Sequence, residues 1–305
     1  MAAVKTDHLH RTAAEPRDKS LNTVTLAEII EINDQVRLFR LELSAPLRFL
    51  PGQWLDVYVP GVSKAGGYTI TSPPSSARSS TSHDPSSPPS QPYLELAVQK
   101  SPDPPAAWLW QDPDSITYSE LRVRVGGSFV WPPPGINTRT LRKVVFVAGG
   151  VGVNPFMSML SSLAENVGSD DPLEVQFLYS LRHDEGQPRQ ARRLLFVERL
   201  ASIFASGRVR GRLQLFLTGS TGERDEEGVI SCGREEEGGY DVRFRRRRMI
   251  VEDVAAAAGD ASERRLAVVY VCGVPTMADA FVQKLADPQH GFGMEPHRVL
   301  CEKWW

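Results

Sequence analysis

The stretch VVFVAGGVGVNPFMSML, Val144 to Leu160, decides the fold of the second half of this chain. Its first four residues are large and apolar, glycines stand at 149, 150 and 152, and Pro155 opens a spaced apolar pattern. We expect a buried strand over residues 143–149, a glycine turn, and a helix from Pro155 to Glu165.

Such a turn can receive the phosphates of a ligand. A helix N-terminus carries partial positive charge, and glycine lets an anion approach the backbone without a Cβ in the way. The spacing is not the G-x-G-x-x-G of the Rossmann fingerprint, because Asn154 and Pro155 stand where that pattern continues. A glycine turn that merely bends the chain therefore stays open as an alternative.

A second apolar run, VYVCGVPTMADAF from Val269 to Phe281, has the same organisation. It predicts a buried strand that ends at Cys272 and Gly273, followed by a helix with proline in its first turn. Ligands of open α/β sheets bind beyond the carboxyl ends of such strands. The two runs therefore predict one binding edge.

Apolar strands and amphipathic helices alternate over residues 137–305, which predicts an α/β domain with a parallel sheet. Expected strands cover 143–149, 173–180, 212–219 and 265–273, and expected helices 189–205 and 275–285. The Gly- and Glu-rich stretch with the arginines 245–248 is interpreted as an inserted loop, about 219–248, with a solvated charge run.

Residues 21–136 predict an antiparallel six-stranded β-barrel. Six segments rich in branched residues or alternating with period two make up this half: 23–32, 36–44, 51–60, 66–72, 93–100 and 121–130. Residues 72–92 are mostly serine and proline, so we expect a disordered insertion there. Residues 1–20 are polar, and we expect them to be disordered as well.

Composition narrows the function classes. The chain has 305 residues, a net charge of −2 and three widely separated cysteines. Nothing overall favours nucleic acid, and no ligand spacing predicts a metal site or a disulfide frame. No apolar run approaches the roughly 18 residues of a membrane helix. We expect an intracellular protein, cytoplasmic or mitochondrial, although acidic residues near the start argue against a transit peptide.

The motifs GGVGVNP (149–155) and CGVPTM (272–277) resemble the two dinucleotide-binding signatures of the ferredoxin–NADP reductase superfamily. The resemblance implies that the first motif holds the pyrophosphate and that the Cys-Gly pair lies beside the nicotinamide. The implied dinucleotide contacts are Gly149, Gly150, Val151, Gly152, Val153, Asn154, Pro155, Cys272, Gly273 and Met277.

In the barrel half, PGQWLDV (51–57) and GGYTITS (66–72) resemble the superfamily's flavin segment with its R-x-Y-S signature. The resemblance implies flavin contacts at Tyr68, Thr69, Thr71 and Ser72, with the Thr69 hydroxyl near flavin N5. Gly66 stands where the signature has the arginine that pairs with the flavin phosphate; Lys100 and Arg124 are candidate substitutes.

The terminal CEKWW resembles the Glu-x-aromatic ending of the plant and bacterial reductases. By that resemblance Glu302 assists proton transfer, Trp304 stacks on the flavin, and Trp305 is an additional cofactor contact. The catalytic residues implied are Thr69, Glu302 and Trp304. More narrowly, the flavin segment and this ending resemble the oxidoreductase NAD-binding domain-containing protein group.

The resemblance implies a flavin-dependent NAD(P)H oxidoreductase with FAD, FMN or a weakly held flavin. No cysteine cluster provides an iron–sulfur relay, so the electron acceptor would be a separate protein or small molecule. Ser180 and Arg182 suit a 2′-phosphate, whereas Asp184 and Glu185 suit a ribose hydroxyl; the resemblance favours NAD. The alternative is a non-catalytic dinucleotide sensor or an accessory electron-transfer subunit.

Overall fold

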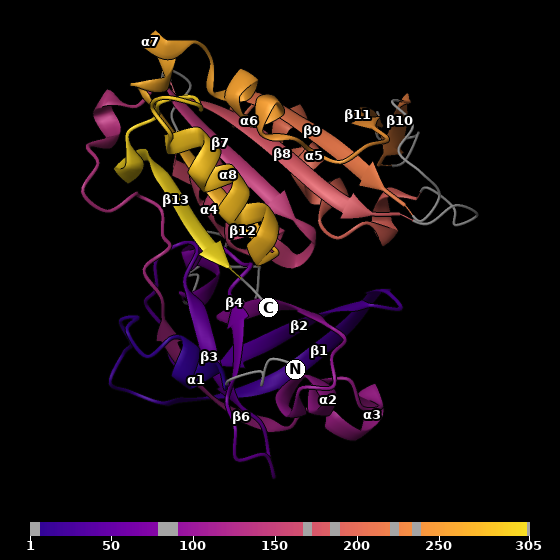
Figure 1. The fold of residues 1–305 in the computed structure, drawn as a ribbon. Helices are drawn as coiled ribbons and strands as arrows, with labels where there is room; N and C mark the ends of the chain where they lie inside the picture. The colour runs from indigo at the N-terminus through magenta and orange to yellow at the C-terminus, as the bar shows by residue number, and fades with distance from the viewer. Residues whose placement is uncertain are drawn as a thin grey trace, which may run out of the picture. The chain divides into compact units, whose positions relative to one another are not determined.

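The computed structural model describes residues 7–78, 91–166, 173–183, 190–219, 226–233 and 239–303. The chain forms two compact units, each built on its own sheet (Figure 1). The first unit covers the chain up to Trp131 together with Met157–Ser162, and the second covers Pro132–Phe156 and the chain from Leu163 onward.

The first unit is a six-stranded antiparallel barrel, as predicted. Its strands follow the order β4-β3-β6-β1-β2-β5. A bridge between Ile70 and Leu96 and a hydrogen bond from the Thr71 amide to the Glu95 carbonyl (2.8 Å) join β4's continuation to β5 and close the sheet. The strands are β1 (Asn22–Asn33), β2 (Val36–Leu43), β3 (Trp54–Tyr58), β4 (Gly66–Thr69), β5 (Tyr93–Gln99) and β6 (Glu120–Gly126).

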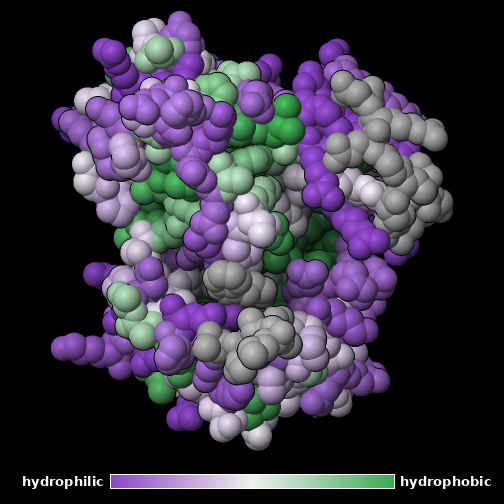
Figure 2. Space-filling view, viewed as in Figure 1, coloured by the Kyte–Doolittle hydropathy of each residue, from purple (hydrophilic) through white to green (hydrophobic). Residues whose placement is uncertain are grey.

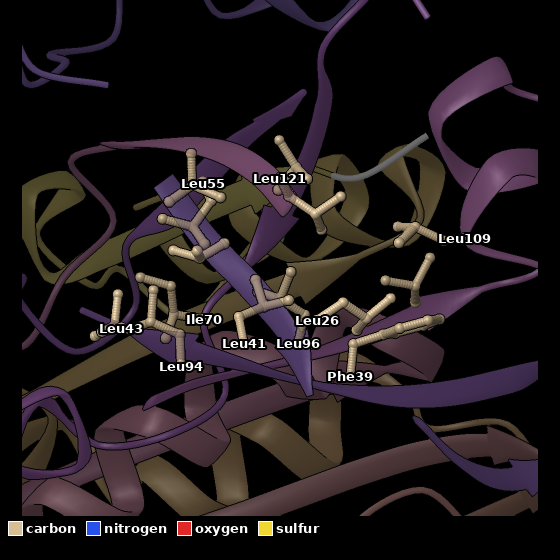
Figure 3. Packing of buried hydrophobic residues seen from close by; sticks show 14 of the residues in the cluster. Leu26, Phe39, Leu41, Leu43, Leu55, Ile70, Leu94, Leu96, Leu109 and Leu121 are labelled. Atoms are coloured by element: carbon tan, nitrogen blue, oxygen red, sulfur yellow. The ribbon is translucent and has the colours of Figure 1, made fainter. Parts of the chain in front are cut away.

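Period-two alternation sends every second side chain of these strands into one apolar core. In Figure 3, leucines from several strands lie together with Ile70 and Phe39, and Leu109 joins them from a short helix. The short elements of this unit are α1 (His8–Arg11), η1 (Pro74–Ala77), α2 (Pro104–Leu109) and α3 (Pro113–Ile116).

The prediction of a disordered N-terminus is wrong for residues 7–20. This segment forms α1, buries His8, and pairs Arg17 with Gly126 at the end of β6. It is held by contacts with residues far along the chain, which a polar composition does not reveal. In the predicted insertion 72–92, Ser72 is buried and η1 is ordered; residues 79–90 lie outside the described part.

The second unit is built on a seven-stranded sheet of order β10-β11-β9-β8-β7-β12-β13. Its strands are β7 (Lys143–Gly149), β8 (Glu174–Arg182), β9 (Gly211–Thr218), β10 (Glu227–Cys232), β11 (Tyr240–Arg245), β12 (Ala267–Gly273) and β13 (Val299–Lys303). Neighbouring strands are parallel except for β10 and β11. The predicted α/β architecture is confirmed.

Helices cover both faces of this sheet. They are α4 (Asn154–Asn166), α5 (Val197–Ala205), α6 (Val251–Ala258), α7 (Ala261–Arg264) and α8 (Pro275–Ala286), with short 3₁₀ turns η2 (Thr138–Thr140), η3 (Gly150–Val153), η4 (Ala191–Arg193) and η6 (Pro296–Arg298). Val145 and Val147 pack toward α6 and α8, whereas Phe146 stacks on Phe156 of α4 with ring centroids 4.9 Å apart. In Figure 1, α8 runs along β12 and β13.

The interpretation of residues 219–248 as an inserted loop is wrong for its described core. β10 and β11 form an antiparallel hairpin, and β11 adds to the sheet beside β9. The alternating residues Ile230, Cys232, Val242 and Phe244 are buried, although glycine and glutamate surround them in sequence. The alternation of apolar residues, rather than the polar composition of the segment, therefore determines that it forms strands.

The arginine run after β11 is engaged in ion pairs. Arg247 donates two hydrogen bonds to the Asp253 carboxylate, both 2.7 Å, and Arg245 pairs with Glu227 at 3.1 Å. Hydrophilic side chains gather over this end of the sheet (Figure 2). Among the described residues, no helix is long and apolar enough to cross a membrane.

Candidate functional site

The turn after β7 has the features expected of an anion cradle. β7 ends at Gly149, η3 follows, and the 13-residue helix α4 begins at Asn154, with Pro155 in its first turn. Gly150 has φ +56°, a left-handed conformation that favours glycine, and a Cβ built on it would meet nothing within 4 Å. The chain at Gly150, four residues before α4 begins, therefore borders open space.

Gly152 serves a different purpose in the same turn. A Cβ on it would lie 2.3 Å from the carbonyl oxygen of Cys272, so only glycine lets the turn rest against the end of β12. Val151 is half-buried, whereas Val153, Asn154 and Pro155 are buried around it.

The two motifs, about 120 residues apart in sequence, meet at this edge of the sheet. β12 pairs with β7 in parallel, with Cys272 opposite Ala148. The Met277 methyl group lies 3.1 Å from the position a Cβ would take on Gly149 and 2.6 Å from that on Gly273. The predicted dinucleotide residues of both strands are thus neighbours.

Cys272 is a packing residue in this arrangement. It is fully buried, and burial, with smaller contributions from Glu302 and Cys301, raises the pKa of its thiol well above the usual value. The thiol is therefore neutral and a poor nucleophile. Glu302 lies beside it in register on β13, whereas Trp304 and Trp305 lie outside the described residues.

The predicted flavin residues lie on β4 and the segment after it. The Tyr68 ring folds back over Gly66, whose Cβ position lies 2.6 Å from the phenol oxygen. Burial, and secondarily the nearby Asp103 carboxylate, raises the pKa of Tyr68. Its hydroxyl is buried and has no hydrogen-bond partner among the described residues.

Thr69, Thr71 and Ser72 are also buried. The Thr71 hydroxyl donates to the Glu95 carboxylate at 2.7 Å, and the Ser72 hydroxyl accepts from the Glu95 amide at 3.1 Å. These two hydroxyls therefore stabilise the barrel closure, and their flavin contacts stay a prediction.

Neither candidate substitute for the signature arginine is a free cation. Arg124 donates to Asp56 at 2.9 and 2.7 Å, and the Lys100 ammonium lies 5.2 Å from the centre of the Trp110 ring. Asp103 adds negative charge near Tyr68. The residues at the start of β4 thus suit the uncharged parts of a flavin better than its phosphate.

A buried charge cluster behind β4 was missed by the sequence analysis. The Asp56 carboxylate is fully buried and accepts hydrogen bonds from His8 (2.9 Å), Arg17 (3.0 Å) and Arg124. The His8 ring fills the space over Gly67, 2.1 Å from its Cβ position. Asp56, an acidic residue inside the apolar run WLDVYV, was a sequence signal for this cluster. No sequence pattern pointed to its partners His8 and Arg17.

No family model matches the chain. It is 29% identical over 307 residues to "Oxidoreductase NAD-binding domain-containing protein 1" of Danio rerio, covering 99% of this chain and 98% of that protein. It is 25% identical over 169 residues, 55% of the chain, to the "2-halobenzoate 1,2-dioxygenase electron transfer component" of Burkholderia cepacia, covering 43% of that protein.

Solved structures share the fold. A ferredoxin NADP⁺ reductase from Neisseria gonorrhoeae with bound FAD and NADP superposes with a TM-score of 0.61 at 15% identity, over 94% of this chain and 100% of that one. The cytochrome b5 reductase domain of Ulva prolifera nitrate reductase gives 0.58 at 16% identity, over 93% and 98%. The chain is thus similar over its full length to the oxidoreductase NAD-binding domain-containing proteins and shares the fold of these two reductases.

Proposed function

We propose that this protein is an NAD(P)H-dependent flavin oxidoreductase that delivers electrons to a separate acceptor. The observation that carries the proposal is the open turn at Gly150, whose left-handed backbone borders free space between β7 and α4. The name of the full-length relatives includes NAD binding, and the solved reductase with the same fold holds FAD and NADP.

The dinucleotide would be held by the edge that β7 and β12 form. Backbone amides of the turn from Gly149 to Asn154 would donate to the pyrophosphate, where the helix dipole favours negative charge. Cys272, Gly273 and Met277 would border the nicotinamide end, with Met277 supplying an adaptable apolar contact. These groups bind and orient and take no part in covalent chemistry.

One observation supports a flavin site on the barrel: the buried Tyr68 hydroxyl has no hydrogen-bond partner among the described residues. Tyr68 would hydrogen-bond the flavin, and the Thr69 hydroxyl would stabilise charge at its reactive nitrogen. Bound together, the two cofactors supply hydride transfer from nicotinamide to flavin. Glu302 would hold or pass a proton, and Trp304 and Trp305 would exclude water from the rings.

Coenzyme and acceptor are the finer parts of this proposal. Ser180 and Arg182 close β8, where Ser180 is half-buried and Arg182 exposed. Asp184 and Glu185 lie outside the described residues. We propose NAD as the preferred coenzyme, FAD or FMN as the flavin, and an electron-accepting protein or small molecule as the partner. The name of one relative, an electron transfer component of a dioxygenase, supports the separate acceptor.

The direct test is a spectrum. Purified protein, reconstituted with FAD or FMN, is expected to show flavin absorbance that bleaches under anaerobic conditions on addition of NADH. A protein that binds dinucleotide but neither carries nor takes up a flavin would contradict the enzyme and favour a sensor. High-performance liquid chromatography of the released pigment identifies the flavin.

Gly150→Ala is expected to weaken NADH binding at least tenfold, because its methyl group enters the space proposed for the phosphates. The left-handed backbone costs about 1–2 kcal/mol of stability in addition. Gly135→Ala is the matched control, since Gly135 has φ +74° and open space but no proposed ligand. Equal NADH affinity in both variants, measured by fluorescence titration, would count against the cradle.

Tyr68→Phe is expected to separate stability from flavin affinity. Removing an unpartnered buried hydroxyl leaves the stability of the flavin-free protein unchanged or raises it by about 1 kcal/mol. Flavin affinity should fall roughly 3- to 10-fold, because one hydrogen bond to the flavin is lost. Tyr118→Phe, at an exposed tyrosine, is the control. Unchanged flavin affinity would remove Tyr68 from the site.

A further inference from the structure

A cavity of about 560 Å³ opens on the first unit, apart from every residue proposed to bind flavin or dinucleotide. Four parts of the chain line it: the N-terminal strap, defined as residues 16–18, the loop before β3, the turn after β4, and Val125 of β6. Its volume lies within the range of about 300–1,000 Å³ that is usual for small-molecule sites.

Two arginines of this cavity are free cations within the described part of the chain. Arg48 and Arg78 are both exposed, and neither has a side-chain hydrogen bond or ion pair to another described residue. Arg17, the third arginine of the lining, is instead bound to Asp56. Asp18 also lines the cavity but forms no ion pair with a described residue, so the two free guanidinium groups outweigh its charge.

The wall beside these cations is apolar. Leu47 and Phe49 are buried with one side on the cavity, and Leu50 is 49% exposed there. Gln53 fixes the loop, because its side-chain amide donates to the Gly127 carbonyl at 3.1 Å and its oxygen accepts from the Leu50 amide at 2.8 Å. The wall is therefore anchored to the barrel.

We propose that this cavity binds a small phosphate monoester with an apolar or aromatic body. Guanidinium groups match phosphate oxygens by paired, charge-assisted hydrogen bonds. A phosphate monoester carries nearly two negative charges and three acceptor oxygens, so it can engage Arg48 and Arg78, which come from different loops, at once. The apolar body would lie on Leu47, Phe49 and Leu50.

The test uses the full-length protein and phenyl phosphate as the probe, measured by isothermal titration calorimetry at low salt. Saturable millimolar or tighter binding is expected, with weaker binding of phenol, benzoate and inorganic phosphate. Arg48→Gln and Arg78→Gln should each lower the affinity about tenfold or more, as for a lost charge-assisted hydrogen bond. Arg208→Gln removes an exposed arginine of the second unit and should change nothing.

Several outcomes would overturn the proposal. They are no saturable binding, unchanged affinity in both pocket variants, and benzoate that binds as tightly as phenyl phosphate. Inorganic phosphate that binds as tightly as phenyl phosphate would exclude the apolar part. Flavin and NADH affinities should be the same in Arg48→Gln as in the native chain, so a failure here is distinguishable from a failure of the proposed redox function.

Discussion

Asp56→Asn is expected to destabilise the protein by about 3 kcal/mol. Removing one member of a buried ion pair costs about 3–5 kcal/mol, because the remaining charges stay buried without compensation. The lower end applies here, since the side chains of Arg124 and Arg17 are 25% and 14% exposed and retain some water. Urea unfolding followed by circular dichroism measures the loss.

The same substitution should weaken the pH dependence of the free energy of unfolding at acidic pH. Burial by itself raises the pKa of Asp56, but hydrogen bonds from His8, Arg124 and Arg17 outweigh it and lower the pKa below the ordinary 3.8. A carboxyl whose pKa is lowered by folding stabilises above its unfolded pKa, and this contribution disappears as pH falls through the folded value. The native chain should therefore lose stability below about pH 4 more steeply than Asp56→Asn.

Glu120→Gln is the control for both measurements. Glu120 is exposed on β6, so its replacement should change the free energy of unfolding by less than about 0.5 kcal/mol. If Asp56→Asn behaves like this control, the carboxylate does not anchor the N-terminal segment. Limited proteolysis provides a second measurement, since freeing His8 and Arg17 should expose residues 7–18 to cleavage.

The charge cluster also marks the limit of prediction from sequence. Alternation in LRVRVGG or YLELAVQ is a local signal, and it predicted the barrel strands because each strand shows its buried face within a few residues. The sequence around Arg17 carries no such pattern, and the partner that joins Arg17 to the barrel, Asp56, is 39 positions away. A polar segment held by one buried acceptor is indistinguishable in sequence from a disordered tail.

The sequence did not predict the hairpin of β10 and β11 for a related reason. Only four alternating apolar residues are buried there, and the surrounding glutamates and glycines outweigh them in any composition window. The adjacency of the two glycine motifs could be predicted, because each motif ends a continuous apolar strand of the same parallel sheet. The glycines indicated a sharp turn and an open backbone at these strand ends, and the structure places Met277 against Gly149 and Gly273.

Gly152→Ala is expected to be the most damaging single change at the candidate site. The new methyl group would lie 2.3 Å from the Cys272 carbonyl oxygen and 2.6 Å from its carbon. These are backbone atoms of β12, a strand flanked by β7 and β13, so they cannot move aside as a flexible side chain would.

We expect Gly152→Ala to lower the free energy of unfolding by about 1–3 kcal/mol, the usual cost of overpacking. Because the added methyl group pushes the turn away from β12, the variant should bind NADH too weakly to measure. Gly150→Ala provides the contrast two residues earlier, with open space around its methyl group and only backbone strain. The two variants should therefore lose NADH affinity for different reasons. At position 152 the methyl group collides with the protein itself, and at position 150 it collides with the ligand. At one NADH concentration, the melting temperature should rise most in the native chain, less in Gly150→Ala, and not at all in Gly152→Ala. A Gly152→Ala protein with native stability and native NADH affinity would show that the close approach of the turn to β12 is not needed for the site.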